Sequence, residues 1–297
     1  MKKQELNQEK GIRYVSKQSE EYPDRLRNII NQPEGIYVLG KLPEKGEKLV
    51  AIVGARECSY YGESAARYFA GKLAEAGVGI VSGMARGIDA AAHLGALEAG
   101  GKTYAVLGSG VDVCYPKSNR DLYERIREQG GILSEYAAGT PPLAFHFPMR
   151  NRIISALSDG VLIVEARKKS GSLITADLAL EQGKDVYAVP GGIFDPLSEG
   201  CNQLIAQGAA IAFSPEDLLK DIGILTKNSE KKRQKNNFSL ATRQKLVYSH
   251  LCLLPKSVDA LGREVELPAE ELLPVLLELE MGGYVREVAK NHFIKEK

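Results

Sequence analysis

Short apolar runs alternate with amphipathic stretches from residue 49 to residue 222. The apolar runs predict strands at 50–53, 78–81, 104–107, 132–133, 161–164, 186–189 and 210–213. The stretches between them have helical spacing, at 61–76, 88–99, 119–129, 150–157 and 172–182. Strands that alternate with helices are typical of βα units, which place their strands side by side in a parallel sheet.

The two ends of this region have their own patterns. Residues 1–20 are polar and are expected to fray, and residues 22–42 carry spaced apolar positions that predict a short helix. At the other end, Ser214 precedes Pro215 and two acidic residues, a strong signal for a helix start. We therefore expect a polar tail and short helical preface at 1–45 and the α/β domain at 46–225.

A second small domain is expected after a linker. Residues 226–237 are polar and lysine-rich and cannot bury a core, so they predict a basic linker. Residues 238–297 then contain helical periodicity at 241–253, a serine-capped helix from Ser257, a third helix at 267–280 and a hairpin at 284–295. Three helices followed by a hairpin predict a winged helix, a relative of the helix-turn-helix.

Charge and cysteine content narrow the possible functions. The net charge of the 297 residues is only +1, so nucleic acid would have to bind at a local basic patch. The four cysteines are far apart, which argues against a metal site and a disulfide framework and favours a reduced, cytoplasmic setting. The N-terminus lacks an apolar signal core, and no segment is long enough to span a membrane.

The polar residues around the strand at 161–164 predict an anion site. Arg150, Asn151 and Arg152 precede this strand, and a turn rich in lysine and serine follows it, at 167–175. In an open α/β sheet, ligands bind at the carboxyl ends of the strands, and a helix start there suits a phosphate. The alternative is a solvated turn between strand and helix.

The turns after the first two strands carry similar residues. Gly54 and Arg56 follow the first strand, and Gly83 and Arg86 follow the second, without the Gly-x-Gly-x-x-Gly dinucleotide pattern. Asp89 and His93 lie one helical turn apart, and a structural hydrogen-bonded pair is expected there rather than a catalytic one. The carboxylates Glu135 and Glu165 reach the same edge, where they could act as bases or pair with the arginines.

These turns together resemble the DNA-processing protein A (DprA) family, also called Smf. The resemblance rests on the motifs at 53–56, 82–89, 107–110, 150–155, 170–176, 189–191 and 200–205, and the tail resembles the family's winged-helix appendage. Ala55 departs from the threonine or serine that is usual in the family, which removes one possible hydroxyl contact. The resemblance implies an extended Rossmann-like domain followed by a small C-terminal winged helix.

The resemblance further implies a DNA-binding protein of natural transformation and recombination and not an enzyme, with no cofactor. Such proteins bind and protect single-stranded DNA, help to load the RecA recombinase, and form homodimers. The residues expected to contact DNA are Gly54, Arg56, Ser59, Gly83, Arg86, Phe147, Arg150, Asn151, Arg152, Lys168, Lys169, Ser170, Gly171, Ser172 and Thr175. Phe145, Phe147 and Tyr136 are candidates for base stacking or for core packing.

The last strand and helix of the main domain are the expected dimer interface. A terminal strand exposes an edge that needs covering, and a self-paired patch there makes a two-fold dimer. The residues expected in that patch are Ile211, Phe213, Leu218 and Leu219.

An alternative function comes from the same Rossmann-like superfamily, which includes nucleotide phosphoribohydrolases. Those enzymes use a Pro-Gly-Gly-x-Gly-Thr turn with a catalytic Glu/Arg pair. Here Leu173 and Ile174 stand at the comparable turn instead of glycine, which disfavours the hydrolase.

The winged helix departs from the usual expectation of duplex binding. Its third helix carries Glu270, Glu271, Glu278 and Glu280 and no lysine or arginine between residues 268 and 281. Carboxylates would repel the phosphates of a major groove. We expect the tail to bind protein or its own main domain; the alternative is weak backbone binding through Arg263, Arg286 and Lys290.

Overall fold

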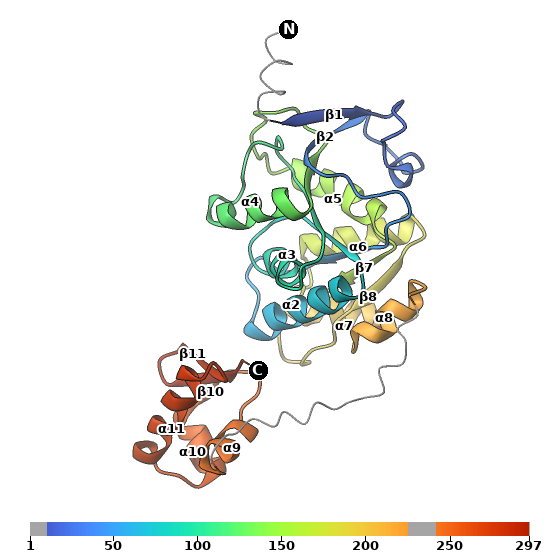
Figure 1. Cartoon of the computed structure of the whole chain (residues 1–297). Helices are drawn as coiled ribbons and strands as arrows, with labels where there is room; N and C mark the ends of the chain where they lie inside the picture. Colours follow the sequence, from blue (N-terminus) through green and yellow to red (C-terminus); the bar gives the residue numbers. More distant parts are fainter. Residues whose placement is uncertain (1–10, 225–241, 297) are drawn as a thin grey trace. The chain divides into compact units, whose positions relative to one another are not determined.

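The computed structural model describes residues 11–224 and 242–296 of the chain. The chain divides into two compact units, residues 1–226 and 227–297 (Figure 1). The predicted linker at 226–237 lies outside the described residues. Within the described part of the chain, no helix is both long enough and apolar enough to cross a membrane.

The first unit is built on a nine-stranded sheet among the described residues, in the order β1-β2-β6-β5-β4-β3-β7-β8-β9. The strands are β1 (Ile12–Ser16), β2 (Gly35–Gly40), β3 (Leu49–Val53), β4 (Gly79–Ser82), β5 (Thr103–Val106), β6 (Gly131–Ser134), β7 (Gly160–Ile163), β8 (Asp185–Ala188) and β9 (Ala210–Ile211). Strands β3 to β9 run parallel to one another. These are the seven predicted strands, with boundaries shifted by one or two residues.

The helical preface predicted at 22–42 is wrong, and so is the frayed segment where it is described, because β1 lies within residues 11–20; residues 1–10 lie outside the described residues. Strands β1 and β2 pair with each other antiparallel, and β2 pairs antiparallel with β6, so the sheet is mixed. Only the short 3-10 helix η1 (Asp24–Leu26) lies between them. The reason is that Ile36 and Val38 alternate with period two and are both buried against the main core.

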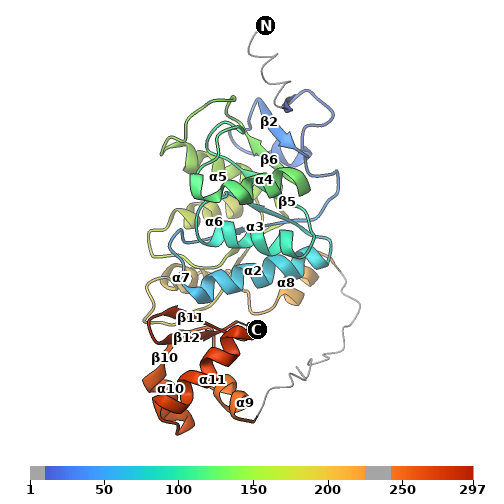
Figure 2. The ribbon, with the colours of Figure 1, turned by 60° about the vertical axis from the view of Figure 1, so that its left-hand side comes forward.

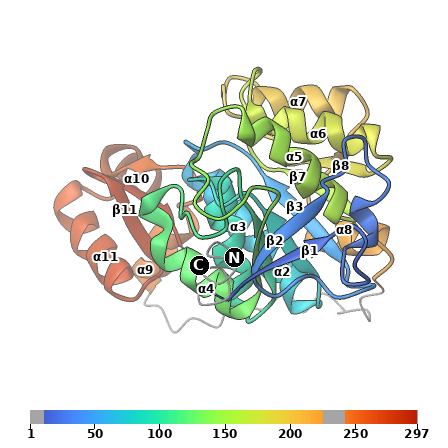
Figure 3. The ribbon, with the colours of Figure 1, turned by 90° about the horizontal axis from the view of Figure 1, so that it is seen from above.

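Helices cover both faces of the sheet (Figure 3). On one face lie α5 (His146–Leu157), α6 (Gly171–Glu181) and α7 (Glu199–Ala206), which pack on alternate strand residues such as Ala51 and Val161. On the other lie α2 (Tyr60–Glu75), α3 (Ile88–Glu98), α4 (Arg120–Gln129) and α8 (Pro215–Asp221). Ser214 caps α8 as predicted, since its hydroxyl accepts the N–H of Asp217 at 3.3 Å. Helix α7 and the 3-10 helix η2 (Lys117–Asn119) were not predicted.

The path of the chain creates a switch point in the middle of the sheet. From β3 the chain builds outward through β4, β5 and β6, and α5 then returns it to β7 on the other side of β3. The connections that leave the carboxyl ends of the neighbouring strands β3 and β7 therefore run in opposite directions. Such a point opens a crevice for ligands at the carboxyl edge.

The second unit has the predicted winged-helix pattern. Its elements are α9 (Thr242–Ser249), β10 (Lys256–Ser257), α10 (Val258–Val265), α11 (Ala269–Met281), β11 (Val285–Ala289) and β12 (His292–Lys295), and the strands form the sheet β10-β12-β11 (Figure 2). Ser257 caps α10 by accepting the N–H of Ala260 at 3.1 Å. Buried residues such as Leu261, Leu272 and Phe293 form a core of its own.

Candidate functional site

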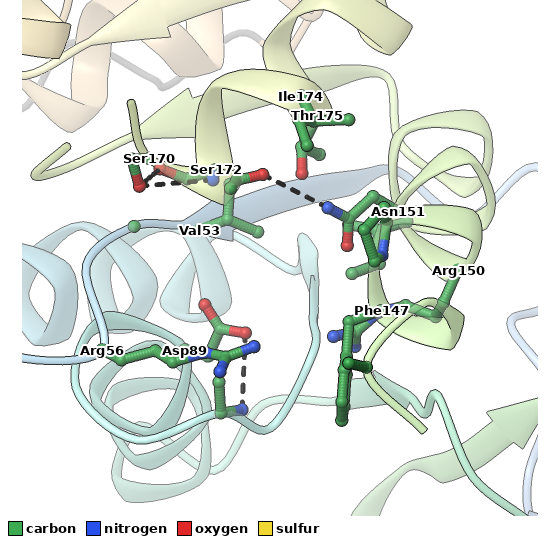
Figure 4. A pocket seen from close by; sticks show the side chains of 16 residues that line it. Val53, Arg56, Asp89, Phe147, Arg150, Asn151, Ser170, Ser172, Ile174 and Thr175 are labelled. Carbon is green, nitrogen blue, oxygen red and sulfur yellow. Dashed lines mark hydrogen bonds between the residues drawn. The ribbon is translucent and has the colours of Figure 1, made fainter. Parts of the chain in front are cut away.

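A pocket of about 300 Å³ lies at the switch point of the sheet. Figure 4 shows Arg56 and Asp89 on one side, the α5 side chains opposite, and the start of α6 closing the third side. The structure brings nine of the expected residues together as lining residues: Gly54, Arg56, Phe147, Arg150, Asn151, Ser170, Gly171, Ser172 and Thr175. Within the described ranges 11–224 and 242–296, no group of three or more His, Cys, Asp or Glu side chains could hold a metal ion.

The start of α6 supplies hydroxyl groups and a positive helix end. Ser170 is the N-cap, and its hydroxyl accepts the N–H of Ser172 at 3.4 Å and lies 2.8 Å from the Ser172 hydroxyl. Across the pocket, the Asn151 amide donates to the Gly171 carbonyl at 3.4 Å. N–H groups at a helix start favour a negatively charged ligand.

Arg150 supplies a buried positive charge. One of its terminal nitrogens donates to the Val106 carbonyl, and the guanidinium lies so close to Gly83 that a Cβ there would overlap it. Burial lowers the pKa of Arg150 to about 10, while the Asp89 carboxylate opposes the shift, so the group remains charged at neutral pH. Glycine at position 83 therefore makes room for this charge.

Arg56 supplies a second, exposed charge beside an aromatic stack. Its guanidinium carbon lies 5.3 Å from the centre of the Phe147 ring, and that of Arg150 lies 6.0 Å from it. The Tyr115 ring lies 5.6 Å from the Phe147 ring. Arginine over an aromatic face is held by cation–π attraction, so these cations are positioned before any ligand binds.

The predicted pairing of Asp89 with His93 is wrong. The Asp89 carboxylate accepts the N–H groups of Gly83 at 3.1 Å and Ala85 at 3.4 Å. His93 instead faces Thr103, with 2.6 Å between Nδ1 and the hydroxyl oxygen, and that hydroxyl donates to the Ile80 carbonyl at 2.9 Å. Nδ1 must therefore carry the proton, which leaves buried Nε2 with no partner among the described residues.

This histidine predicts a loss of stability in acid. Burial lowers the pKa of His93 to about 3, whereas the unfolded chain takes up the same proton near pH 6.5. Stability is therefore lost as the pH falls below 6.5, by about 1.4 kcal/mol at pH 5.5. Urea unfolding at pH 7 and pH 5.5 measures the difference. Replacement of His93 by glutamine should remove it, and an unchanged difference in that variant would contradict the assignment.

Asp89 changes the stability with pH in the opposite direction. The parent protein therefore has to be compared with the His93 variant. Burial raises the pKa of Asp89, against the lowering effect of Arg150 and the two N–H donors. A raised carboxyl pKa reduces stability as the pH rises above 3.8. The difference between the parent and the His93 variant isolates the histidine, because Asp89 is common to both.

Two of the expected residues serve the scaffold and do not line the pocket. Ser59 caps α2, accepting the N–H of Gly62 at 3.1 Å, and it is tied through its hydroxyl and its N–H to the buried carboxylate of Glu165. Arg152 forms a bidentate pair with Glu135, at 2.9 and 2.7 Å, on a different face of α5 from Arg150. Glu135 therefore pairs with an arginine, as one of the two interpretations held, whereas the structural partner of Glu165 is Ser59.

The remaining expected residues lie next to the pocket. Gly83 and Arg86 line a smaller cavity of about 40 Å³ that shares Arg56, Phe147 and Arg150 with the first. Lys168 and Lys169 are exposed in the β7–α6 connection, and the Lys168 amine lies 3.6 Å from the Glu199 carboxylate.

The sequence reasoning did not assign Tyr115 to this site. It lines the smaller cavity and packs on Phe147. The available signal was its place before Pro116, in the loop that follows β5, because the carboxyl end of β5 reaches the same edge of the sheet. The peptide bond between Tyr115 and Pro116 is cis.

Comparison with known proteins identifies the family of this chain. The family model for DNA recombination-mediator protein A matches residues 13–223, and the model for the DprA winged helix domain matches residues 232–290. The Escherichia coli protein Smf is 41% identical over 278 residues, which cover 91% of this chain and 74% of the relative. The DNA processing protein DprA of Streptococcus pneumoniae is 47% identical over 200 residues, 67% of this chain and 71% of the relative.

Two solved structures that resemble this chain are DNA processing proteins of the same family. The crystal structure of Streptococcus pneumoniae DprA has 43% identity and a TM-score of 0.68, covering 73% of this chain and 77% of that one. The Helicobacter pylori DNA processing protein A, a structure that concerns its single-stranded DNA binding mode, has 31% identity and a TM-score of 0.64, covering 71% of this chain and 95% of that one. The chain therefore belongs to the DprA family of DNA recombination-mediator proteins, with a Rossmann-like domain and a DprA winged helix.

Proposed function

We propose that this chain binds single-stranded DNA through the pocket at the switch point, as a binding protein and not as an enzyme. The observation that carries the proposal is the meeting of two arginines, Arg56 and Arg150, with the helix start at Ser170 around one pocket. Cations and N–H groups are the ordinary partners of phosphates. An open carboxyl edge also allows a polymer to continue beyond the pocket.

Base stacking would add affinity that does not depend on sequence. Phe147 lines the pocket between the two arginines, and Phe145 is exposed. Tyr136 is already stacked on His146, with 3.8 Å between the ring centres, so it is the weakest of the three candidates. Phe147 is therefore the aromatic that we expect to contact a base.

The biological role follows the family. The Helicobacter pylori relative is known for a single-stranded DNA binding mode, and other relatives are named DNA processing proteins. We infer that this chain protects incoming single strands during natural transformation or recombination and helps to load the RecA recombinase. Binding curves with single- and double-stranded oligonucleotides over a range of salt concentrations test the DNA-binding step. Equal affinity for both, or no binding at moderate salt, would contradict it.

A phosphoribohydrolase is the alternative function, and the pocket has few groups that could act as its catalytic acid or base. Asp89 is the only carboxylate among the residues that line the pocket in the described part of the chain, and it accepts two backbone N–H groups. A release assay on nucleoside monophosphates, run beside the DNA-binding assay, distinguishes the two functions.

The next prediction is that the chain forms a dimer through the edge of β9. Two of the four residues expected in that interface do not belong to it. Leu218 and Leu219 are buried in the core of their own domain and cannot face a partner. Ile211 and Phe213 are 49% and 73% exposed. We expect light scattering to report a dimer that Phe213→Ser weakens by about tenfold, since an exposed aromatic anchor loses about 1.4 kcal/mol or more on truncation. A monomeric parent protein would refute this.

The winged helix is predicted to bind protein or its own main domain, and not duplex DNA. In α11, Leu273, Leu277 and Met281 are exposed at intervals of four residues and form an apolar stripe beside Glu270 and Glu278. The isolated fragment 238–297 should show no duplex binding at physiological salt, because carboxylates repel phosphates. Glu270→Lys with Glu278→Lys should create weak binding if charge is the cause. Micromolar duplex binding by the parent fragment would refute the prediction.

A further inference from the structure

The connection between β8 and α7, residues 189–198, carries two of the most exposed apolar side chains of the described chain. Ile193 is 84% exposed and Phe194 is 93% exposed. The Gly192 carbonyl accepts the N–H of Asp195 at 3.1 Å, so both side chains occupy the central positions of a hydrogen-bonded β-turn. Turn positions usually carry Gly, Pro, Asn, Asp or Ser, and an aromatic ring at the tip therefore calls for a reason beyond turn formation.

The turn is held rigidly by its own hydrogen bonds. The Asp195 carboxylate accepts the Leu197 N–H at 3.0 Å and the Ser198 hydroxyl at 2.8 Å. At its base, the Asn202 amide donates to the Gly191 carbonyl at 3.1 Å and accepts the Gly191 N–H at 3.3 Å. A ligand that contacts the tip does not have to order it first, which lowers the entropy cost of binding.

The turn is attached to the segment that leads to the pocket. The Leu197 carbonyl accepts the N–H of Ala166 at 2.8 Å, and the Ala166 carbonyl accepts the N–H of Gly200 at 2.7 Å. From Ala166 the chain runs through three exposed cations to Ser170, which lines the pocket. Because β7 and β8 are parallel neighbours, these cations and the turn all lie at the carboxyl edge of the sheet.

A polymer bound in the pocket would extend past it. A volume of about 300 Å³ is at the lower end of small-ligand sites and holds only a small part of a single strand. Along the carboxyl edge toward β8, the phosphates of such a strand would meet Arg167, Lys168 and Lys169. Phe194 belongs to the turn whose Leu197 carbonyl is bonded to Ala166, the residue that precedes these cations. Grooves of positive charge with exposed rings are the usual way to bind single strands.

We propose that Phe194, supported by Ile193, is a second base-stacking platform for the single-stranded DNA whose phosphates occupy the pocket. This inference rests on the proposed function and adds a subsite to it. Three neighbouring exposed cations favour a polyanion over an apolar protein surface as the occupant. A duplex hides the faces of its bases, so the ring selects single strands.

The chain contains no tryptophan, which allows a direct test. Phe194→Trp places the chain's single tryptophan at the tip, and an oligothymidylate of about 20 nucleotides, longer than the roughly 4–16 nucleotides that a single-strand-binding OB fold occupies, should quench its emission. A trithymidylate that fills only the pocket should not. Tyr14→Trp, at an exposed position of β1, is the matched control and should not respond to either oligonucleotide.

Affinity gives the second measurement. Phe194→Ala should weaken binding of the long oligonucleotide about tenfold and leave the trinucleotide unchanged, whereas Phe194→Trp should bind as the parent does. Phe194→Leu should behave like the alanine variant, since it keeps an apolar side chain but has no ring. The ring is almost fully exposed, so these variants should keep the parent's melting temperature.

The outcomes separate this inference from the function on which it rests. Arg56→Ala should weaken the binding of both oligonucleotides. If Arg56→Ala has this effect while Phe194→Ala changes neither and the tryptophan is silent, the subsite is refuted and the tip is a protein contact. Leucine at position 194 binding as well as phenylalanine would also refute stacking. If no oligonucleotide binds the parent protein, the proposed function itself fails.

Discussion

Replacing Arg56 by alanine should weaken the binding of single-stranded DNA by about 30-fold at physiological salt, equally for every sequence. Hydrogen bonds to charged groups contribute about 1.5–3 kcal/mol, and a 30-fold change corresponds to about 2 kcal/mol. Arg56 is exposed and packs over Phe147, so its removal should leave the fold intact. Fluorescence anisotropy with labelled oligonucleotides of several sequences measures the change.

The salt dependence shows whether the lost contact is to a phosphate. Each phosphate contact on a single strand contributes about −0.7 to the slope of log affinity against log salt, so Arg56→Ala should flatten the slope by about that amount. Arg56→Lys keeps the charge and should keep the slope, while losing the planar contact with Phe147 and part of the affinity. Arg13 of β1, which is exposed and paired with Glu21, is the matched control. If Arg56→Ala and Arg13→Ala bind alike, the pocket is not the DNA site.

The edge of the sheet that holds the pocket could be predicted because it depends on strand direction alone, although the switch point on that edge depends on strand order. Gly54, Gly83 and Ser170 follow three different strands, and parallel strands end at one edge of a sheet whatever their order. Apolar runs and helical spacing were enough to find those strands. The chemistry of the turns was then readable from residue type, and the structure brings most of the expected residues to one pocket.

The two N-terminal strands were missed because their signal depends on tertiary contacts. The apolar residues of β2, such as Ile36 and Val38, become buried only when β2 pairs with β6 and packs on the main core. The same limit explains Leu218 and Leu219, which an open strand edge suggested as an interface but which α8 turns inward. Sequence pattern shows that a residue is apolar, and the packing of distant elements decides which surface it covers.

Arg150 and Arg152 show the limit of predicting DNA contacts from residue type. Both were expected to contact DNA, yet two residues on a helix are separated by about 200° around its axis, so they cannot share a face. Periodicity therefore excludes one of them, but the choice depends on what packs against each side of α5. Arg150 donates to the backbone of β5 and lines the pocket, whereas Arg152 pairs with Glu135. Only the assembled sheet makes that assignment.

That assignment leads to the largest stability effect that we expect. Arg152→Ala should destabilise the first domain by about 3–5 kcal/mol, because it leaves the largely buried Glu135 carboxylate without its positive partner. Arg152 also donates to the Asn31 and Met149 carbonyls, at 3.1 and 2.9 Å, and these hydrogen bonds would be lost as well. Urea unfolding followed by circular dichroism measures the loss.

A double variant distinguishes the structural role of the Arg152–Glu135 pair from a role in DNA binding. Arg152→Met with Glu135→Leu removes both charges and should recover much of the stability lost in Arg152→Ala, since the penalty comes from the unpaired carboxylate. At a temperature where it is folded, this double variant should bind single-stranded DNA with nearly the parent's affinity and salt slope, because neither side chain lines the pocket. A loss of affinity comparable to that of Arg56→Ala, in a protein shown to be folded, would mean that Arg152 contacts DNA after all. An Arg152→Ala protein as stable as the parent would mean that the pair with Glu135 does not hold α5 in place.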